Sequence, residues 1–342
     1  MIEASKTGLN VQRTERTGSH ASKGPVWALL AAAVTSLAWT APAHANDCAM
    51  LSPSAAPTSL PLVAEHRYRM AGKIRPLLFF WIGRDDVGEA RIAWRRGDGG
   101  SAGFELLIGS DPRRAPRGIN RWGYLREEVR PGHGRTIGVM TQSDEESIEE
   151  AEARIALEGQ DGVHVFKAIQ AAATTDEACA FVTTVHVGRD LTYRDVATLL
   201  NALARPLDDA AALRRIAVPP GTQPGFLVAL AELIQRSVDA HRRPASAPRS
   251  PPDSLGYVYN AKLHDLTLRQ AEFVPEVRLG DRTYAAVIRG EFESRDRSSG
   301  SKTRFEILYG TEGALKAVPV HIVYHPRWWL RVELFLEERA AF

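Results

Sequence analysis

Three dense apolar runs within residues 74–129 most constrain what this chain can fold into. The first, at 77–82, is apolar at every position, so as a strand it must be covered on both faces. The second, at 91–96, alternates isoleucine and tryptophan with arginine, which is typical of a half-buried strand. A glycine-rich turn at 97–103 leads to the third run at 104–108. This pattern predicts antiparallel hairpins.

A leader precedes this region. Residues 1–24 are polar and hold four basic and two acidic residues, 26–39 are almost wholly apolar, and Ala43-His44-Ala45 has a small-x-small form. These features are typical of a secretory signal peptide, spanning 1–45 and cleaved after Ala45. The alternative is an uncleaved anchor, since the apolar stretch approaches the about 20 residues that a membrane helix needs. Its alanine content and a proline favour cleavage.

The net charge of the exported part argues against some partners. The whole chain has 43 Lys and Arg and 41 Asp and Glu, so losing the leader leaves 39 of each. A balanced charge gives no reason to expect nucleic acid as a partner. The apolar run at 77–82 is too short to span a bilayer, so we expect no transmembrane segment in the mature chain.

Composition divides the mature chain into four parts. Residues 46–64 form a Pro-rich tether, and 65–241 form an amino-terminal α+β domain. A second Pro-rich stretch at 242–254 reads as a linker, and 255–342 alternates like antiparallel β-structure throughout. We therefore predict two domains joined by this linker.

Helical spacing of apolar residues occurs in three places. The first, 143–158, opens with a capping box of Ser143 and Glu146. The others are 193–204 and 224–240, and the last is the most clearly amphipathic segment of the chain. The predicted fold class is α+β: mainly antiparallel, curved or sandwich-like β-sheets, with three packing helices between an amino-terminal and a carboxy-terminal β region.

Cys48 and Cys179 are the two cysteines of the chain, and both lie in the exported part. An oxidising compartment favours their pairing. In the chain-entropy view a disulfide closing a loop of this size stabilises by roughly 4 to 5 kcal/mol. A reactive thiol is the alternative, but no Cys-x-x-Cys spacing supports it.

A likeness between two segments suggests a duplicated β unit. Phe104 and Phe305 each begin a similar eight-residue run, and each run is followed later by an Arg-Trp pair that ends in Trp122 or Trp328. The proposed units are residues 91–129 and 288–334. The alternative is that strands followed by glycine turns resemble one another by chance.

Motifs for known chemistry are absent from the sequence: no Gly-x-Ser-x-Gly, no phosphate-binding glycine loop and no His-Glu-x-x-His. No cofactor is therefore expected. If the turn between 163–171 and 179–187 centres on Thr175, His164 faces His186 across two strands, near enough to share a metal. A third ligand is unidentified, and a slip of one residue would separate the pair.

Three segments resemble hypothetical exported bacterial proteins that have no assigned activity: 79–88, 107–112 and 119–124. In addition, 257–336 is similar to periplasmic proteins of unknown function built on a curved antiparallel sheet with an apolar concavity. These resemblances imply export and a curved sheet. They supply no catalytic residues, because a fold does not settle a function.

Two functions fit these observations. The first is a non-enzymatic periplasmic or cell-envelope protein that binds an apolar small molecule or an envelope protein on curved β-sheets. Its candidate ligand-binding residues are Trp329, Arg331, Arg327 and Trp122. The second is an exported hydrolase whose site assembles only in space. Its first candidates are His133, Asp85, His164 and His186.

We expect the exported protein to begin at Asn46. Intact-mass measurement on periplasmic material should show the loss of residues 1–45, because signal peptidase cleaves after a small-x-small site. The full mass in a membrane fraction would contradict cleavage and favour the anchor.

We also expect Cys48 and Cys179 to be disulfide-bonded after export. Thiol titration of the denatured, unreduced protein should find no free thiol, and titration after reduction should find both. Two thiols before reduction would disprove the pairing.

Overall fold

A computed structural model describes most of the chain beyond residue 59. The described residues are 60–74, 82–118, 120–140, 163–188, 190–203, 213–242, 253–327 and 330–337. Two compact units make up the chain, Met1–His44 and Ala45–Phe342, and every described residue belongs to the second. The expected signal peptide, the helix at 143–158, most of the tether and most of the Pro-rich linker lie outside the described residues, and residues 62–64 of the expected tether belong to a strand.

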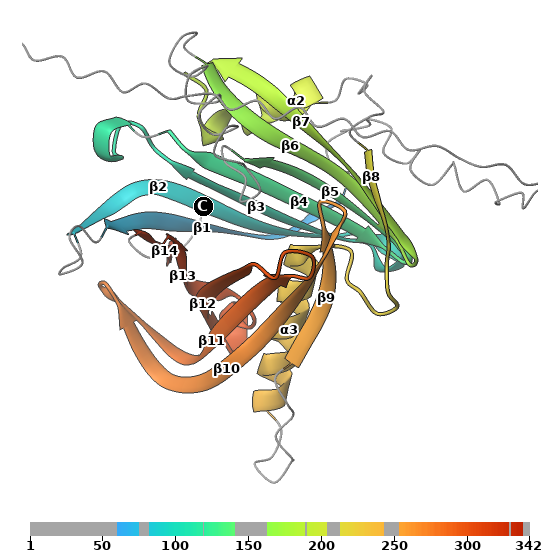
Figure 1. Cartoon of the computed structure of the whole chain (residues 1–342). Coiled ribbons are helices and arrows are strands. Elements are labelled where there is room, and N and C mark those ends of the chain that lie inside the picture. Colours follow the sequence, from blue (N-terminus) through green and yellow to red (C-terminus); the bar gives the residue numbers. More distant parts are fainter. Residues whose placement is uncertain are drawn as a thin grey trace, which may run out of the picture. The chain divides into compact units, whose positions relative to one another are not determined.

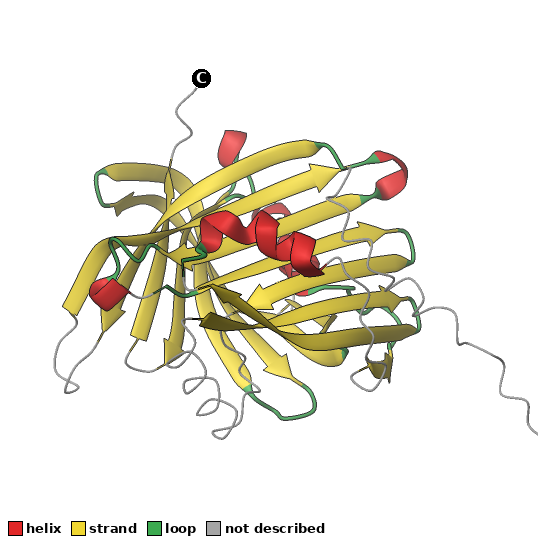
Figure 2. Ribbon diagram, turned by 90° about the horizontal axis from the view of Figure 1, so that it is seen from above, coloured by secondary structure: helices red, strands yellow, loops and turns green. Residues whose placement is uncertain are grey.

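Fourteen strands form one antiparallel sheet, and strands make up most of the described chain (Figure 2). Their bounds are β1 Leu62–Ile74, β2 Ile82–Arg96, β3 Ala102–Ser110, β4 Trp122–Arg130, β5 His133–Met140, β6 Val163–Thr174, β7 Glu177–Gly188, β8 Leu213–Ala217, β9 Asp253–Tyr259, β10 Lys262–Leu279, β11 Arg282–Asp296, β12 Lys302–Gly310, β13 Pro319–Arg327 and β14 Leu330–Glu337. The order across the sheet is β8-β7-β6-β5-β4-β3-β2-β1-β14-β13-β12-β11-β10-β9.

The predicted fold class is therefore wrong. Strands from both sides of the Pro-rich linker belong to one sheet, instead of two β regions separated by helices. In the described part of the chain there are two α-helices, α2 (Val196–Leu203) and α3 (Phe226–His241), which coincide with two of the three predicted helical segments to within about three residues at each end. No helix of the described residues is long and apolar enough to cross a membrane. Alternation predicts strands, but it does not say which strands from distant parts of the chain pair.

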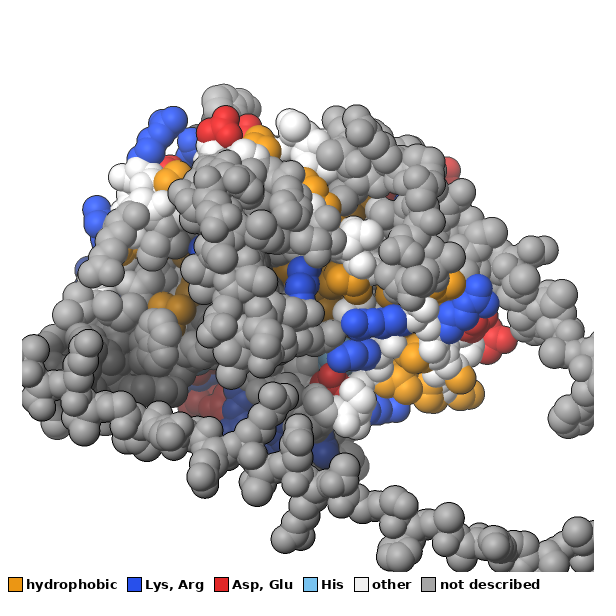
Figure 3. Space-filling model, turned by 45° about the horizontal axis from the view of Figure 1, so that its top comes forward, with side chains coloured by type: hydrophobic (Ala, Val, Ile, Leu, Met, Phe, Trp, Pro, Cys, Tyr) orange, Lys and Arg blue, Asp and Glu red, His pale blue; other side chains and the backbone are white. Residues whose placement is uncertain are grey.

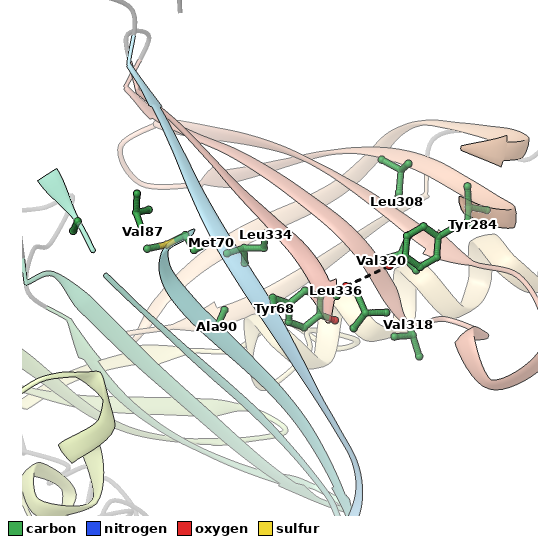
Figure 4. Close-up of a cluster of buried hydrophobic side chains, with 12 residues drawn as sticks. Tyr68, Met70, Val87, Ala90, Tyr284, Leu308, Val318, Val320, Leu334 and Leu336 are labelled. Atoms are coloured by element: carbon green, nitrogen blue, oxygen red, sulfur yellow. Dashed lines mark hydrogen bonds between the residues drawn. The ribbon is translucent and has the colours of Figure 1, made fainter. Parts of the chain in front are cut away.

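Pairing of β1 with β14 joins the two ends of the sequence. Eight residue pairs connect the strands, from Arg67 with Glu337 to Ile74 with Leu330. A buried cluster of twelve side chains covers this junction (Figure 4). In it the Tyr68 hydroxyl donates to the carbonyl of Pro319 at 2.9 Å, and Tyr284 donates to the carbonyl of Leu336 at 3.3 Å. These bonds satisfy tyrosine hydroxyls that would otherwise be costly to bury.

The two helices pack on opposite faces of the sheet. Apolar side chains of α3 pack with residues of β9 to β12 in one buried cluster, and Figure 1 shows α3 beside β9 and β10. The face that bears α3 is called the α3 face here. The opposite face, called the α2 face, carries α2 and the 3₁₀ turn η5 (Tyr193–Asp195), which pack on residues of β3 to β6.

The segment after β8 crosses to the other edge of the sheet. Gln223 forms a bridge with Tyr257 of β9, donating its backbone N–H to Gly256 and accepting one from Val258. Small side chains line this contact, where Ala171 and Ala180 pack with Ala261. The two edge strands of the sheet therefore approach each other at this end.

The proposed repeat is wrong in one respect and supported in another. Trp122 begins β4, which pairs with β3, whereas Arg327 ends β13, which pairs with β12 and corresponds to β4 in strand order. These Arg-Trp pairs are therefore not equivalent. Phe104 and Phe305, however, are both half-buried and both lie on the strand that follows a long hairpin strand.

Candidate functional site

An apolar patch of half-buried side chains lies on the α3 face of the amino-terminal strands. It consists of Trp94, Phe104, Leu106, Leu125 and Val182. None of the five belongs to a buried cluster of the described residues. Ordinary core residues would be fully covered, so a group of apolar side chains that stay only half-buried on one sheet face indicates a contact surface.

Strand register gathers the patch. Trp94 pairs with Phe104 across β2 and β3, and Leu106 pairs with Leu125 across β3 and β4. The same row continues through Gly138 of β5 and Ile169 of β6 to Val182 of β7. Directly paired residues point to the same face, so this row is apolar across five strands.

Gly138 leaves a low point in the middle of this row. A Cβ atom there would lie 3.7 Å from Leu125 and from Ile169, and 3.8 Å from the Tyr259 hydroxyl of β9. The patch is thus bordered by a polar hydroxyl from the carboxy-terminal strands. An apolar surface with few polar groups at its border is the usual composition of a small-molecule site.

Glu127 connects the patch to α3. It follows Leu125 on the same face of β4, is only 1% exposed, and accepts a hydrogen bond from the backbone N–H of Val228 at 3.1 Å. Gly225 precedes the helix, and a Cβ atom there would lie 2.2 Å from the Glu127 carboxylate. Only glycine therefore lets the carboxylate reach the first turn of α3.

Burial raises the pKa of Glu127 to about 7, against its ordinary value of 4.5, although the backbone N–H groups of Phe226, Leu227 and Val228 lower it. Desolvation thus outweighs the favourable field of the helix amino terminus. One carboxylate oxygen, Oε1, is buried with no hydrogen-bond partner among the described residues. The ionised form is for this reason costly here.

A charged cleft lies on the α2 face of the carboxy-terminal strands. Its volume is about 360 Å³, and its charged or polar lining comes from Arg269, Glu291, Arg304, Glu306, His325 and Arg331. Along β12, Arg304 and Glu306 alternate with Phe305 and Ile307, which pack with the α3 cluster. The charged side chains therefore face away from α3.

Two buried carboxylates hold the arginines of the charged cleft. Glu293 is 8% exposed and lies 2.9 Å from Arg269, 2.8 Å from Arg304 and 3.2 Å from Lys302. Hydrogen bonds from Arg304, Lys302 and Arg269 lower the pKa of Glu293 to about 2, against the opposing effect of burial. Ionised at neutral pH, it fixes three cations.

Glu333 is the second buried carboxylate, and it holds Arg331 of the charged cleft. It is 3% exposed, and its carboxylate lies 2.6 Å from Lys73, 2.9 Å from Arg331 and 3.3 Å from His321. Burial would raise the pKa of Glu333, but His321, Lys73 and Arg331 lower it to about 2. Burial and then the charge of Arg331 lower the pKa of His325 in the cleft.

The residues predicted to bind ligand are dispersed. Arg331 lines the charged cleft, and Arg327 is the last residue of β13. Trp329 lies outside the described residues. Trp122 is 4% exposed and packs on Phe166 with ring centroids 4.5 Å apart, in the core beneath α2.

The histidines and Asp85 are not brought together. The turn between β6 and β7 is one residue out of the expected register, so His164 pairs with Val187, and His186 with Val165. His133 pairs with Thr174 at the far end of β6, about 33 Å along the strand from His164. Asp85 lies on β2. Three strands lie between β2 and β6, so the two are four strand spacings, or about 19 Å, apart. No three His, Cys, Asp or Glu of the described residues form a metal-binding group.

Cys179 lies in β7 and is 3% exposed. Cys48 lies outside the described residues, so its pairing with Cys179 stays a prediction.

Sequence reasoning missed the patch and the Glu127 contact. Leu106 and Leu125 read as ordinary core positions of alternating strands, since only the register shows that they adjoin. The sequence signal for the contact was weak: an acidic residue in an alternating strand, and Gly225 just ahead of a helix.

Comparisons with known proteins give no function. The sequence matches no protein family and no curated protein, which confirms the expectation that no family of assigned activity would be recognised. A solved structure described as a β-barrel-like protein of a domain of unknown function, DUF1849, from Brucella abortus has a TM-score of 0.43 and 10% identity, covering 82% of this chain and 98% of its own. A "putative lipoprotein" from Parabacteroides distasonis has a TM-score of 0.27 and 10% identity, covering 82% of this chain and 96% of its own. At such scores neither likeness carries an argument.

The Glu127→Gln variant should lose a pH dependence of stability. Because the pKa of Glu127 is raised, the folded protein holds a proton that the unfolded chain releases between about pH 4.5 and pH 7. The stabilisation that this proton gives is full below about pH 4.5 and is lost as the pH rises through about 7. The free energy of unfolding of the natural protein should fall by up to about 3 kcal/mol relative to the variant over this range. Urea denaturation at pH 5 and pH 8 measures it.

Glu128→Gln is the matched control, because Glu128 is the next residue of β4 and its side chain points to the other face. This variant should keep the pH dependence of the natural protein. An equal dependence in Glu127→Gln would contradict the role of Glu127.

Proposed function

We propose that this protein is a non-enzymatic, exported cell-envelope protein that binds an apolar small molecule, or the apolar part of one, on the apolar patch. The observation that carries the proposal is the row from Leu106 to Val182, which is apolar on one sheet face and is only half-buried at Leu106, Leu125 and Val182. Export rests on the leader at 1–45 and is proposed with it.

The neighbouring elements support a binding surface at this place. On the same face α3 covers β9 to β12, while α2 packs on the opposite face of β3 to β6. On the patch strands α3 contacts β3, and its first turn lies at Glu127 of β4, while Leu106 and Leu125 remain half-buried. An apolar ligand would gain roughly 25 cal/mol for each Å² of apolar surface that it buries there.

The surface charge gives no support for nucleic-acid binding as an alternative function. In the described part of the face shown in Figure 3, basic and acidic side chains are interspersed with hydrophobic ones. This agrees with the balanced count of 39 basic and 39 acidic residues after the leader. Nucleic-acid binding instead requires clustered basic residues.

Binding of N-phenyl-1-naphthylamine, a neutral probe that fluoresces in apolar surroundings, tests the proposal on the exported protein. We expect saturable binding, and we expect Leu106→Gln and Leu125→Gln each to weaken it by about tenfold, because each removes a half-buried apolar contact of about 1.4 kcal/mol.

Leu279→Gln is the matched control. Leu279 is also a half-buried strand leucine, but it packs against the cluster at the β1–β14 junction. This variant should bind the probe like the natural protein. No saturable binding, or equal affinity in the Leu106→Gln, Leu125→Gln double variant, would rule out the patch as the site.

A further inference from the structure

The charged cleft has opposite charges on separate parts of its wall. Arg269, Arg304 and Arg331 supply the positive charges, and Glu291 and Glu306 supply the negative ones. Glu293 and Glu333, together with Lys302 and Lys73 that contact them, bring the formal count to five positive and four negative charges. A cleft with little net charge but separated signs favours neither a simple anion nor a simple cation.

The acidic part contains an unfavourable pair. Glu291 of β11 and Glu306 of β12 are direct cross-strand partners. Like charges directly opposite each other destabilise a sheet, since their Cβ atoms lie about 5 Å apart. Arg289 approaches Glu306 at 3.7 Å, but none of the described residues forms an ion pair with Glu291. An ammonium group between the two carboxylates would relieve this repulsion.

The basic part is held in place and remains accessible. Arg269 and Arg304 both contact Glu293, and Arg331 contacts Glu333. Their side chains are nevertheless 49%, 68% and 34% exposed, respectively. A guanidinium oriented by a buried carboxylate can still donate to an oxyanion, and orienting it in advance lowers the entropic cost of binding.

We propose that the charged cleft binds a zwitterion that carries a primary ammonium and an oxyanion. The ammonium lies at Glu291 and Glu306, and the carboxylate or phosphate lies at Arg304 and Arg331. A volume of about 360 Å³ accommodates a group of the size of a dipeptide. The ligand is either a free molecule or the head group of a zwitterionic lipid. This site lies on the opposite sheet face from the apolar patch and does not depend on it.

Calorimetry on the exported protein tests the proposal with glycylglycine and O-phosphoethanolamine as free zwitterions. N-acetylglycylglycine and inorganic phosphate serve as probes without the ammonium. We expect the zwitterions to bind at least about tenfold more tightly than these anions. Cosedimentation with phosphatidylethanolamine vesicles, compared with phosphatidylglycerol vesicles, is the lipid arm. Binding in either arm supports the proposal, and the arm that binds identifies the source.

Variants locate the site. Arg304→Gln and Glu306→Gln should each weaken zwitterion binding about tenfold, and both side chains are exposed enough for the fold to tolerate the change. Arg297→Gln is the matched control: Arg297 also pairs with a carboxylate, Asp265 at 2.6 Å, and is 40% exposed, but it does not line the cleft. It should bind like the natural protein.

A second readout is the pKa of His325, which an oxyanion beside Arg331 should raise, as followed by NMR during titration. Equal affinity for the zwitterions and the ammonium-free anions would overturn the proposal in favour of a plain anion site. So would the absence of binding in both arms, or an equal loss of binding in Arg297→Gln.

Discussion

Pairing of β1 with β14 is the contact on which the rest of the fold depends. It joins two antiparallel meanders into one sheet, and the hydrogen bond from Tyr68 to Pro319 spans 251 residues of sequence. Closing so long a loop costs entropy before any contact stabilises it. The buried cluster around Tyr68, Leu334 and Leu336 provides that stabilisation, because it takes side chains from both meanders. The charged cleft depends on this pairing directly, because Lys73 of β1 lies 2.6 Å from Glu333 of β14.

Local sequence predicts much of this structure and little of its assembly. Most strands and the two described helices lie where alternation and helical spacing place them, since these signals depend on neighbouring residues alone. The sharing of one sheet, which made the predicted fold class wrong, depends on contacts across the whole chain. The tight turn at Asn260 and Ala261 was also missed. Both residues have positive φ, 51° and 49°. The usual sequence signal for such a two-residue hairpin turn is Asn-Gly, but here alanine stands in the place of glycine. Ala261 is buried among alanines of β6 and β7 instead.

In the candidate sites, too, single residues could be predicted from the sequence, but the way they come together could not. Arg331 could be selected from the sequence as a basic residue beside tryptophans in a strand, and it does line a cleft. The other walls of that cleft come from β10, β11, β12 and β13, which only the strand order brings beside it. The expected pairing of His164 with His186 failed by a single residue at the β6–β7 turn. A slip of one position exchanges the two faces of a strand, so predictions of facing side chains are less secure than predictions of strands.

The two meanders share more than their strand order. Asp86 and Ala286 both have positive φ, 60° and 51°, and each precedes a buried valine in a long hairpin strand. In the first meander the backbone N–H of Asp111 donates to the Val87 carbonyl, and in the second that of Thr311 donates to the Ala286 carbonyl. A 3₁₀ turn follows each, η4 (Pro116–Gly118) and η7 (Gly313–Leu315). Such matching irregularities favour descent from one unit more strongly than the Arg-Trp pairs did, since a non-glycine residue with positive φ is uncommon. If the meanders are related, α3 covers the α3 face of one copy and leaves the corresponding face of the other half-exposed. On this argument Phe104 and Leu106 of the apolar patch correspond to Phe305 and Ile307, which pack with α3 in the second copy.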